Sequence, residues 1–167
     1  METTEVSIRL ARREEWERVR DLRLRSLEEA PDAFGSTLED EGAYGEREWV
    51  DWIEGWEGAT NVLYVAEAGE AWVGMAVGSR SGSAPNAHLY AMWVEPGSRT
   101  RGIGSRLVHE VLAWARSWDA RWVVLGVTDI NEGAARFYGR LGFADTGKRH
   151  PLREGSERAV RILRREP

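Results

Sequence analysis

Apolar and polar residues alternate with a period of two near the start of the chain, and the period then changes to that of a helix. Apolar residues occupy every second position of the segment 6–10, which predicts a first β-strand. The charged segment 13–29 spaces its apolar residues at near-helical intervals, so we expect an amphipathic helix there. Pro31 and Gly35 interrupt this pattern, and a second helix is predicted over about 46–56.

The middle of the chain contains extended patterns. Two apolar, β-branched runs, 62–68 and 71–79, are separated only by Gly69 and Glu70. A two-residue link between such runs predicts an antiparallel hairpin. After a loop rich in Gly, Ser, Pro and Asn, the segment 88–95 predicts a further strand.

The remaining segments alternate between helical and extended patterns. Beyond Gly102, apolar residues recur at intervals of three and four up to residue 115, which predicts a helix packed on a sheet. The later segments predict a strand, a short helix and two closing strands, over 122–127, 131–140, 143–148 and 158–163. This order predicts one α/β (α+β) domain over residues 1–167, with a mixed, mostly antiparallel sheet of about seven strands and about four helices.

Composition excludes several classes of protein. The 28 acidic side chains outnumber the 23 basic ones, and the net charge of -5 disfavours nucleic acid as a partner. The chain has no cysteine, so disulfides, thiolate metal sites and a cysteine nucleophile are excluded. No apolar run approaches the roughly 20 residues that span a bilayer, and the first residues do not resemble a signal peptide. We therefore expect a cytoplasmic protein without a membrane partner.

A glycine-rich turn lies where the predicted strand at 88–95 passes into the helix that follows. Free backbone N–H groups and the dipole at a helix N-terminus suit an anion, and phosphate is the natural ligand. Glycine at positions 102 and 104 lets the backbone approach a pyrophosphate closely, while Arg99 and Arg101 add positive charge. The alternative interpretation is a strand-to-helix turn that uses glycine only for packing.

Two better-known phosphate loops do not fit this turn. The dinucleotide fingerprint requires a third glycine, but that position is Leu107. The nucleotide triphosphate loop requires a lysine after its second glycine, and that position is Ile103. Each alternative lacks a residue that its chemistry needs.

Two segments, in the right order, resemble the GNAT family of N-acetyltransferases. The first is Arg99-Thr100-Arg101-Gly102-Ile103-Gly104, and the second is Asn131-Glu132-Gly133-Ala134-Ala135-Arg136-Phe137-Tyr138-Gly139-Arg140-Leu141-Gly142-Phe143. A predicted helix and strand separate the two matches, so together they are far more specific than either one. The resemblance implies an acetyl-CoA-dependent N-acetyltransferase in which the strands at 88–95 and 121–127 part to form a slot for the cofactor.

The resemblance also implies cofactor contacts. Main-chain groups at Met92 and Val94 would pair with the pantetheine arm in the manner of an added strand. Asn131 would hydrogen-bond the cofactor, and the hydroxyl of Tyr138 would point at its sulfur. The backbone N–H groups that would take the pyrophosphate are those of Arg99, Thr100, Arg101, Gly102, Ile103, Gly104 and Ser105.

Acetyl transfer to an amine needs a neutral amine, a polarised thioester carbonyl and a proton for the departing thiolate. Tyr138 is the candidate donor of that proton, because a phenol is close to a thiol in acidity. The alternative role for its ring is packing beside Phe137. The carbonyl would be polarised by a backbone N–H near Met92 or Trp93.

The general base has several candidates. His88 occupies the position before the first motif glycine where family members with a dedicated base often carry a carboxylate, and histidine titrates near neutral pH. Its alternative role is that of a surface or hydrogen-bonded residue. The acidic run Glu39, Asp40 and Glu41 could act as base or recognise a cationic amine, and a water molecule is the remaining candidate.

Other residues carry weaker signals. His109 and Glu110 begin a zinc-protease pattern, but the second histidine is replaced by Ala113, so we predict no metal site. His150 precedes Pro151 in a predicted turn, where it either lines the mouth of the acceptor site or is simply exposed.

Tryptophans are abundant, and three of them share one face of the predicted helix at 46–56. Trp49, Trp52 and Trp56 would form either an apolar wall over the acceptor site or part of the core. Core packing is the more frequent cause of such a stripe.

We expect direct transfer in a ternary complex, without a covalent acetyl-enzyme, to a primary amine of a small molecule or peptide. One alternative is a protein N-terminal acetyltransferase with an open groove. Another is an acyl-CoA-binding regulatory module that performs no chemistry. The resemblance is also compatible with a homodimer.

Overall fold

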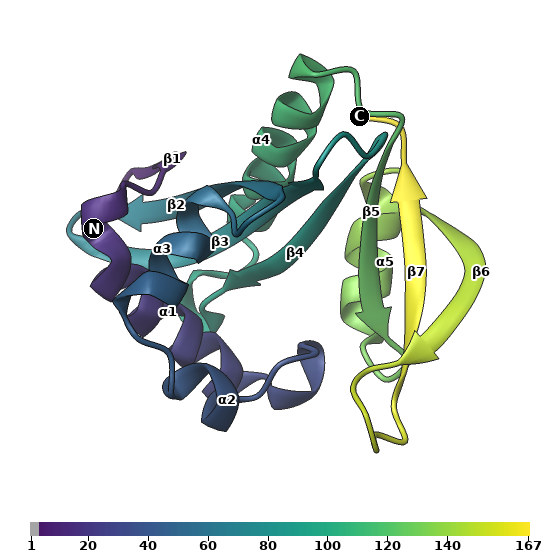
Figure 1. The fold of residues 1–167 in the computed structure, drawn as a ribbon, viewed down its shortest axis with the longest axis horizontal. Helices are drawn as coiled ribbons and strands as arrows, with labels where there is room; N and C mark the ends of the chain where they lie inside the picture. The colour runs from purple at the N-terminus through teal and green to yellow at the C-terminus, as the bar shows by residue number, and fades with distance from the viewer. Residues whose placement is uncertain (1–3) are drawn as a thin grey trace.

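The computed structural model describes residues 4–167, in which a seven-stranded sheet is flanked by helices (Figure 1). The strands are β1 (Val6–Leu10), β2 (Ala59–Ala68), β3 (Ala71–Ser81), β4 (Asn86–Val94), β5 (Trp122–Thr128), β6 (Ala144–Pro151) and β7 (Ala159–Arg165). The α-helices are α1 (Trp16–Glu29), α2 (Leu38–Gly42), α3 (Glu46–Glu54), α4 (Ile103–Ser117) and α5 (Glu132–Arg140). Short 3₁₀ helices lie at Arg13–Glu15, Pro31–Ala33 and Pro96–Ser98.

The strands lie in the order β1-β2-β3-β4-β5-β7-β6. Every neighbouring pair is antiparallel except β4 and β5, which run parallel. The mixed, mostly antiparallel sheet predicted from the sequence is thereby confirmed. The predicted two-residue hairpin is also present, because Ala68 pairs with Ala71 and Gly69 takes a φ of +63° in the turn between them.

Two hydrophobic cores cover the two faces of the sheet. One core packs α1 and α3 on β2, β3 and β4, and the other packs α4 and α5 on the opposite face. Strand β3 contributes to both, since Met75 and Val77 belong to the first core while Val73 and Ala76 belong to the second. A strand buried on both faces has a nearly continuous apolar sequence, as this segment does.

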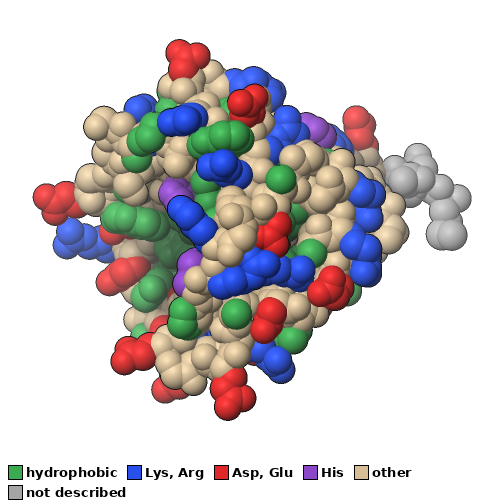
Figure 2. Space-filling model, turned by 90° about the vertical axis from the view of Figure 1, so that its right-hand side faces the viewer, with side chains coloured by type: hydrophobic (Ala, Val, Ile, Leu, Met, Phe, Trp, Pro, Cys, Tyr) green, Lys and Arg blue, Asp and Glu red, His purple; other side chains and the backbone are tan. Residues whose placement is uncertain are grey.

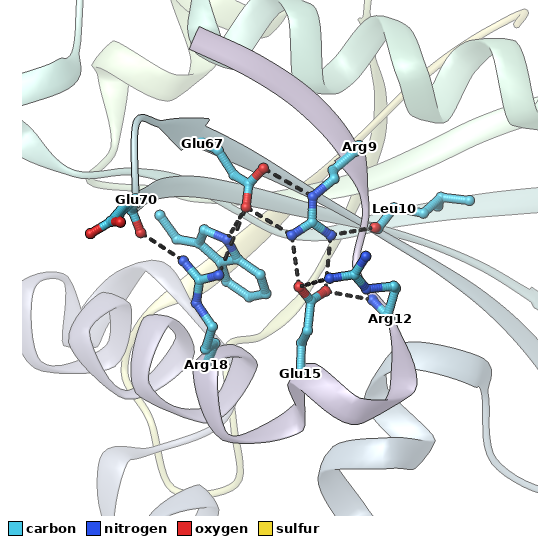
Figure 3. Close-up of polar contacts among 8 residues, drawn as sticks. Arg9, Leu10, Arg12, Glu15, Arg18, Glu67 and Glu70 are labelled. Atoms are coloured by element: carbon cyan, nitrogen blue, oxygen red, sulfur yellow. Dashed lines mark hydrogen bonds and ion pairs between the residues drawn. The ribbon is translucent and has the colours of Figure 1, made fainter. Parts of the chain in front are cut away.

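The start of α1 is fixed to the sheet by a network of charged side chains (Figure 3). Arg9 on β1 donates to Glu15 at 2.7 Å and to Glu67 on β2 at 2.8 Å. The indole N–H of Trp72 donates to the same Glu67 carboxylate at 2.7 Å, and the guanidinium of Arg18 lies 4.2 Å from the Trp72 ring centroid. One guanidinium thus holds two carboxylates from separate elements.

Strands β4 and β5 stay together only at their start. Their ladder consists of Asn86 with Trp122, Ala87 with Val123, and His88 with Val124. In Figure 1, β5, β7 and β6 diverge from β1–β4 beyond this point, with α5 beside them. The separation predicted between these two strands is therefore present, and it creates the site described below.

A bulge bends β4 where it leaves β5. Met75 pairs with Trp93 and Val77 pairs with Tyr90, so Ala91 and Met92 together face Ala76. Ala91 has a φ of +52°, which is unusual for a residue with a Cβ atom. A bulge leaves its extra residue outside the ladder and frees main-chain groups for a ligand.

The region between α1 and β2 differs from the prediction. An additional short helix, α2, contains the acidic run, where no helix was predicted, and its N-cap Thr37 accepts a hydrogen bond from Asp40 N–H. Helix α3 ends at Glu54, because Gly55 follows with a φ of +105°. The prediction that Trp56 shares a helix face with Trp49 and Trp52 was therefore wrong. Trp56 lies beyond the helix and is 46% exposed.

Candidate functional site

A cavity of about 1140 Å³ occupies the separation between β4 and β5. Its walls include Leu89–Val94 of β4 and Leu125–Thr128 of β5, and further walls come from α1, α4, α5 and the segment that follows α1. Figure 2 shows basic and acidic side chains interspersed on the face over β6 and β7, around a hollow whose floor is apolar. A cavity of this size is sufficient for a cofactor arm together with a small acceptor.

The N-terminus of α4 opens into one end of this cavity. Gly102 is its N-cap with a φ of +75°, and no side chain caps the helix. Thr100 also has a positive φ, of +66°, so the turn holds two left-handed residues. Such a turn, followed by uncapped N–H groups and the positive end of a helix dipole, forms a cradle for a pyrophosphate. Six of the seven predicted pyrophosphate contacts line the cavity here, namely Arg99, Thr100, Gly102, Ile103, Gly104 and Ser105.

The two arginines of the first motif behave differently. Arg99 lines the cavity, but its Nη2 donates to Glu29 at 2.9 Å and its Nε donates to the carbonyl of Val94 at 2.8 Å. The side chain of Arg101 turns away and donates to the carbonyl of Thr4 at 3.1 Å, and Arg101 does not line the cavity. An anion bound at α4 therefore depends mainly on backbone N–H groups.

Asn131 lines the cavity as the N-cap of α5. Its Oδ1 accepts a hydrogen bond from Ala134 N–H at 3.0 Å, which satisfies one of the free donors of that helix. The capping bond occupies the side-chain oxygen and leaves the amide nitrogen available. Asn131 is thus placed for the predicted contact through its Nδ2 donor.

Tyr138 lies on α5 and lines the cavity while being only 7% exposed. Its ring packs edge-on between Phe137 and Phe143, with centroid separations of 5.0 and 5.7 Å. Burial raises the pKa of the Tyr138 hydroxyl, so the phenol stays protonated at neutral pH. A protonated phenol at this position is able to donate a proton into the cavity.

The predicted main-chain contacts also reach the cavity. Met92, Trp93 and Val94 line it, beside the bulge in β4. Glycine at 104 lets α4 lie close to α5, because a Cβ atom there would lie 3.2 Å from Cζ of Phe137. The residues present therefore fit the pantetheine and pyrophosphate of coenzyme A.

The opposite half of the cavity is aromatic and contains a buried ion pair. Phe34, Trp52 and Tyr90 line it together with Arg23 and Glu41. Arg23 Nε and Nη2 donate to the two Glu41 oxygens at 2.7 and 3.0 Å. This half has room for an acceptor beside the β4 bulge.

The acidic run divides between solvent and cavity. Glu39 and Asp40 are exposed and do not line the cavity, whereas Glu41 is 2% exposed and lines it. Of the three acidic candidates, only Glu41 reaches the cavity. Its carboxylate is engaged by Arg23, so it is poorly placed to accept a further proton.

The two candidate histidines lie in different places. His88 is exposed at the end of the β4–β5 ladder and does not line the cavity. His150 on β6 does line the cavity, although it is exposed to solvent. Its Nδ1 lies 3.2 Å from the carbonyl oxygen of Pro151, which can only accept a hydrogen bond. A hydrogen bond between these atoms requires the proton on Nδ1 and leaves the lone pair on Nε2.

Several cavity residues were missed from the sequence. Arg23 carried a usable signal, because it lies on the buried face of α1 with Val19, Leu22 and Leu27, where a charge needs a partner. Phe34 carried none, since it lies in an irregular segment between α1 and α2. The side chain of Trp93 gave no signal either, although its indole N–H donates to Glu29 at 2.8 Å.

Within residues 4–167, no group of three or more His, Cys, Asp or Glu side chains is arranged to hold a metal ion. None of the helices in the same range has the length and apolar character to cross a membrane.

Comparisons with known proteins agree with this geometry. A family model described as the acetyltransferase (GNAT) family matches residues 16–143. An uncharacterised N-acetyltransferase of Mycobacterium tuberculosis is 39% identical over 64 residues, which make up 38% of this chain and 41% of that protein. The matched part thus spans about two fifths of the length of that relative.

Solved structures share the fold. An acetyltransferase of the GNAT family from Streptococcus pneumoniae has a TM-score of 0.77 at 20% identity, over 96% of this chain and 99% of that one. The protein yncA from Salmonella typhimurium, solved with its cofactor acetyl-CoA, has a TM-score of 0.76 at 16% identity, over 97% and 94%. At these identities the likeness shows the fold alone.

Proposed function

The chain belongs to the acetyltransferase (GNAT) family, and on this premise we propose that it transfers an acetyl group from acetyl-CoA directly to a primary amine of a small molecule or peptide. The observation that carries the proposal is the cavity between β4 and β5, which α4 bounds at one end and which Tyr138 and the β4 bulge line. Bound acetyl-CoA would supply the acetyl group as an activated thioester. The protein then has to bind and orient the two substrates, and it has to move protons.

Binding and orientation would come from main-chain groups. The uncapped N–H groups at the start of α4 would hold the pyrophosphate, and the free edge of β4 near Met92 and Val94 would pair with the pantetheine arm. A main-chain N–H at the Ala91–Met92 bulge would polarise the acetyl carbonyl, since a donor aimed at developing charge stabilises the transition state.

Proton transfer would use groups on the other side of the cavity. Tyr138 would donate a proton to the sulfur as the thiolate departs, because its hydroxyl is protonated and its side chain lines the cavity. His150 would take a proton from the incoming ammonium through Nε2, directly or through water, because its Nδ1 is held by Pro151. Its placement makes His150 a better candidate base than His88.

The experiment is release of coenzyme A by the purified protein, measured with a free-thiol reagent over a broad panel of primary amines. Controls omit the enzyme or the amine. We expect release that depends on the amine and an acetylated amine as product by mass spectrometry. Tight binding of acetyl-CoA with no release on any amine or peptide would contradict the proposal and favour an acyl-CoA-binding module.

A further inference from the structure

One hydrogen-bond donor in the aromatic half of the cavity has no partner. The Arg23 side chain is 4% exposed and lines the cavity, and its Nε and Nη2 are both bonded to Glu41. Its Nη1 is buried and makes no hydrogen bond to any residue of the described range 4–167. Buried polar groups in folded proteins are almost always bonded, so an oxygen is expected at this nitrogen.

The remaining sides of the guanidinium are covered. Its Cζ lies 4.5 Å from the ring centroid of Phe34 and 4.8 Å from that of Trp52. Glu41 takes the edge formed by Nε and Nη2, which leaves Nη1 as the free edge. Arg23 lines the cavity, but Nη1 itself is enclosed, so an oxygen of a bound molecule would reach it only after the side chains around it shift.

The charges around Arg23 determine which kind of oxygen fits. Arg23 and Glu41 form a pair without net charge, and Glu29 and Arg99 form another in the same cavity. A carboxylate at Nη1 would place an uncompensated negative charge beside Glu41 among aromatic rings, at a large desolvation cost. A neutral carbonyl or hydroxyl oxygen satisfies the donor without that cost.

We infer that Arg23 selects the acceptor, and that the acceptor is an amine with a neutral carbonyl or hydroxyl oxygen close to its amino group, as in an amino-acid amide or an amino alcohol. This inference rests on the proposed transfer of acetyl to an amine. Tyr90 links the two parts of the site, because it lines the cavity near Arg23 and Glu41 and directly precedes Ala91 of the bulge. Arg23 and the bulge thus line one cavity, which an acceptor bonded to Arg23 would share with the acetyl carbonyl.

The first test uses the wild-type protein and amines that share one carbon skeleton. Phenylalaninamide and phenylalaninol carry a neutral oxygen, phenylalanine carries a carboxylate, and phenethylamine carries no oxygen. We expect kcat/KM for the amide and the alcohol to exceed that for the other two by about tenfold or more, because a site built to bond an oxygen rejects an analogue without it. Equal values for the amide and phenethylamine would overturn the inference, and so would a preference for the carboxylate.

The second test removes the donor without leaving a buried charge. The double variant Arg23→Met with Glu41→Leu replaces the ion pair by apolar side chains of similar volume, a change that proteins often tolerate. We expect it to bind acetyl-CoA normally and to lose the preference for the amide over phenethylamine. The matched control is Arg13→Met with Glu54→Leu, which removes an exposed pair and should keep the preference.

The two proposals fail in different ways. If no amine or peptide supports coenzyme A release by the wild-type protein, the acetyltransferase itself is contradicted. If release depends on the amine but the preference persists in the double variant, only the role of Arg23 is overturned. The wild-type series remains decisive even if the double variant does not fold.

Discussion

His88 and Val124 form the last pair of the parallel ladder between β4 and β5. His88 is exposed there and lies outside the cavity walls. We therefore expect His88→Gln to change kcat/KM by no more than about twofold, as for an ordinary surface substitution. Steady-state release of coenzyme A checks this, and a loss of tenfold or more at unchanged Tm would return His88 to the mechanism.

His150→Gln should lower kcat by about 10²-fold, because general-base catalysis typically contributes 10²–10⁴. Steady-state measurement of kcat at pH 7 checks the prediction, with His88→Gln as the matched control. An unchanged kcat would exclude His150 as the base.

Tyr138→Phe should lower kcat by about 10²-fold or more while the Kd for acetyl-CoA stays the same, since the ring and its packing are retained. Burial raises the pKa of the hydroxyl, so ionisation of Tyr138 should cause no loss of wild-type activity between pH 7 and its ordinary pKa of 10.0. Calorimetric binding and turnover are measured on the same preparation. Tyr64→Phe, on β2 outside the cavity walls, is the control that should keep full activity.

Gly102→Ala should weaken binding of coenzyme A about fivefold or more, because a left-handed conformation costs a residue with a Cβ about 1–2 kcal/mol. A Cβ at this position meets nothing within 4 Å, so backbone strain is the cause of the effect. Gly97→Ala is the control, since it has equal space but no positive φ. If the Gly102→Ala and Gly97→Ala variants bound coenzyme A with equal affinity, binding would not depend on a left-handed conformation at the N-cap of α4.

Stability should depend on pH through Glu15. Its hydrogen bonds to Arg9 lower the pKa of the carboxyl from 4.5 to about 2 in the folded protein. A lowered folded-state pKa stabilises the fold above pH 4.5, and this stabilisation is lost as the pH falls towards 2.

Glu15→Gln should therefore reduce the free energy of unfolding at pH 7 by about 1–3 kcal/mol, and the difference from wild type should shrink below pH 4. Urea unfolding at pH 7 and pH 3 checks this. Glu54→Gln, which removes an exposed pair with Arg13, should cost less than about 1 kcal/mol at either pH. A constant difference between wild type and Glu15→Gln at both pH values would contradict the assignment.

Much of the fold was predictable because hydrophobic periodicity is local. The apolar stripe of α4 is buried as expected, and the strands lie within a few residues of their predicted bounds. The glycine-rich turn before α4 was predictable because Gly102 marks a backbone conformation as well as a composition, and its φ is +75°.

The acceptor half of the site was not predictable in the same way. Helix α2 is too short for a periodic signal, and the pairing of Arg23 with Glu41 depends on how two helices pack. His88 and His150 could not be ranked from the sequence, since only tertiary structure shows which of them lies in the cavity. Local patterns thus predicted the cofactor half better than the acceptor half.

The short ladder between β4 and β5 has a consequence for the mechanics of the molecule. Beyond its pairs at Asn86, Ala87 and His88, the two half-sheets are tied at the far side by Arg153, which donates to the carbonyls of Phe34 and Pro31 at 3.1 and 3.3 Å. A ligand bonded to the free edge of β4 would supply main-chain hydrogen bonds that β4 lacks between the short ladder and Arg153. We therefore expect the sheet to be stiffer when a ligand is bound between β4 and β5. The amide protons of Leu89–Val94 should then exchange with solvent more slowly as the ligand concentration rises.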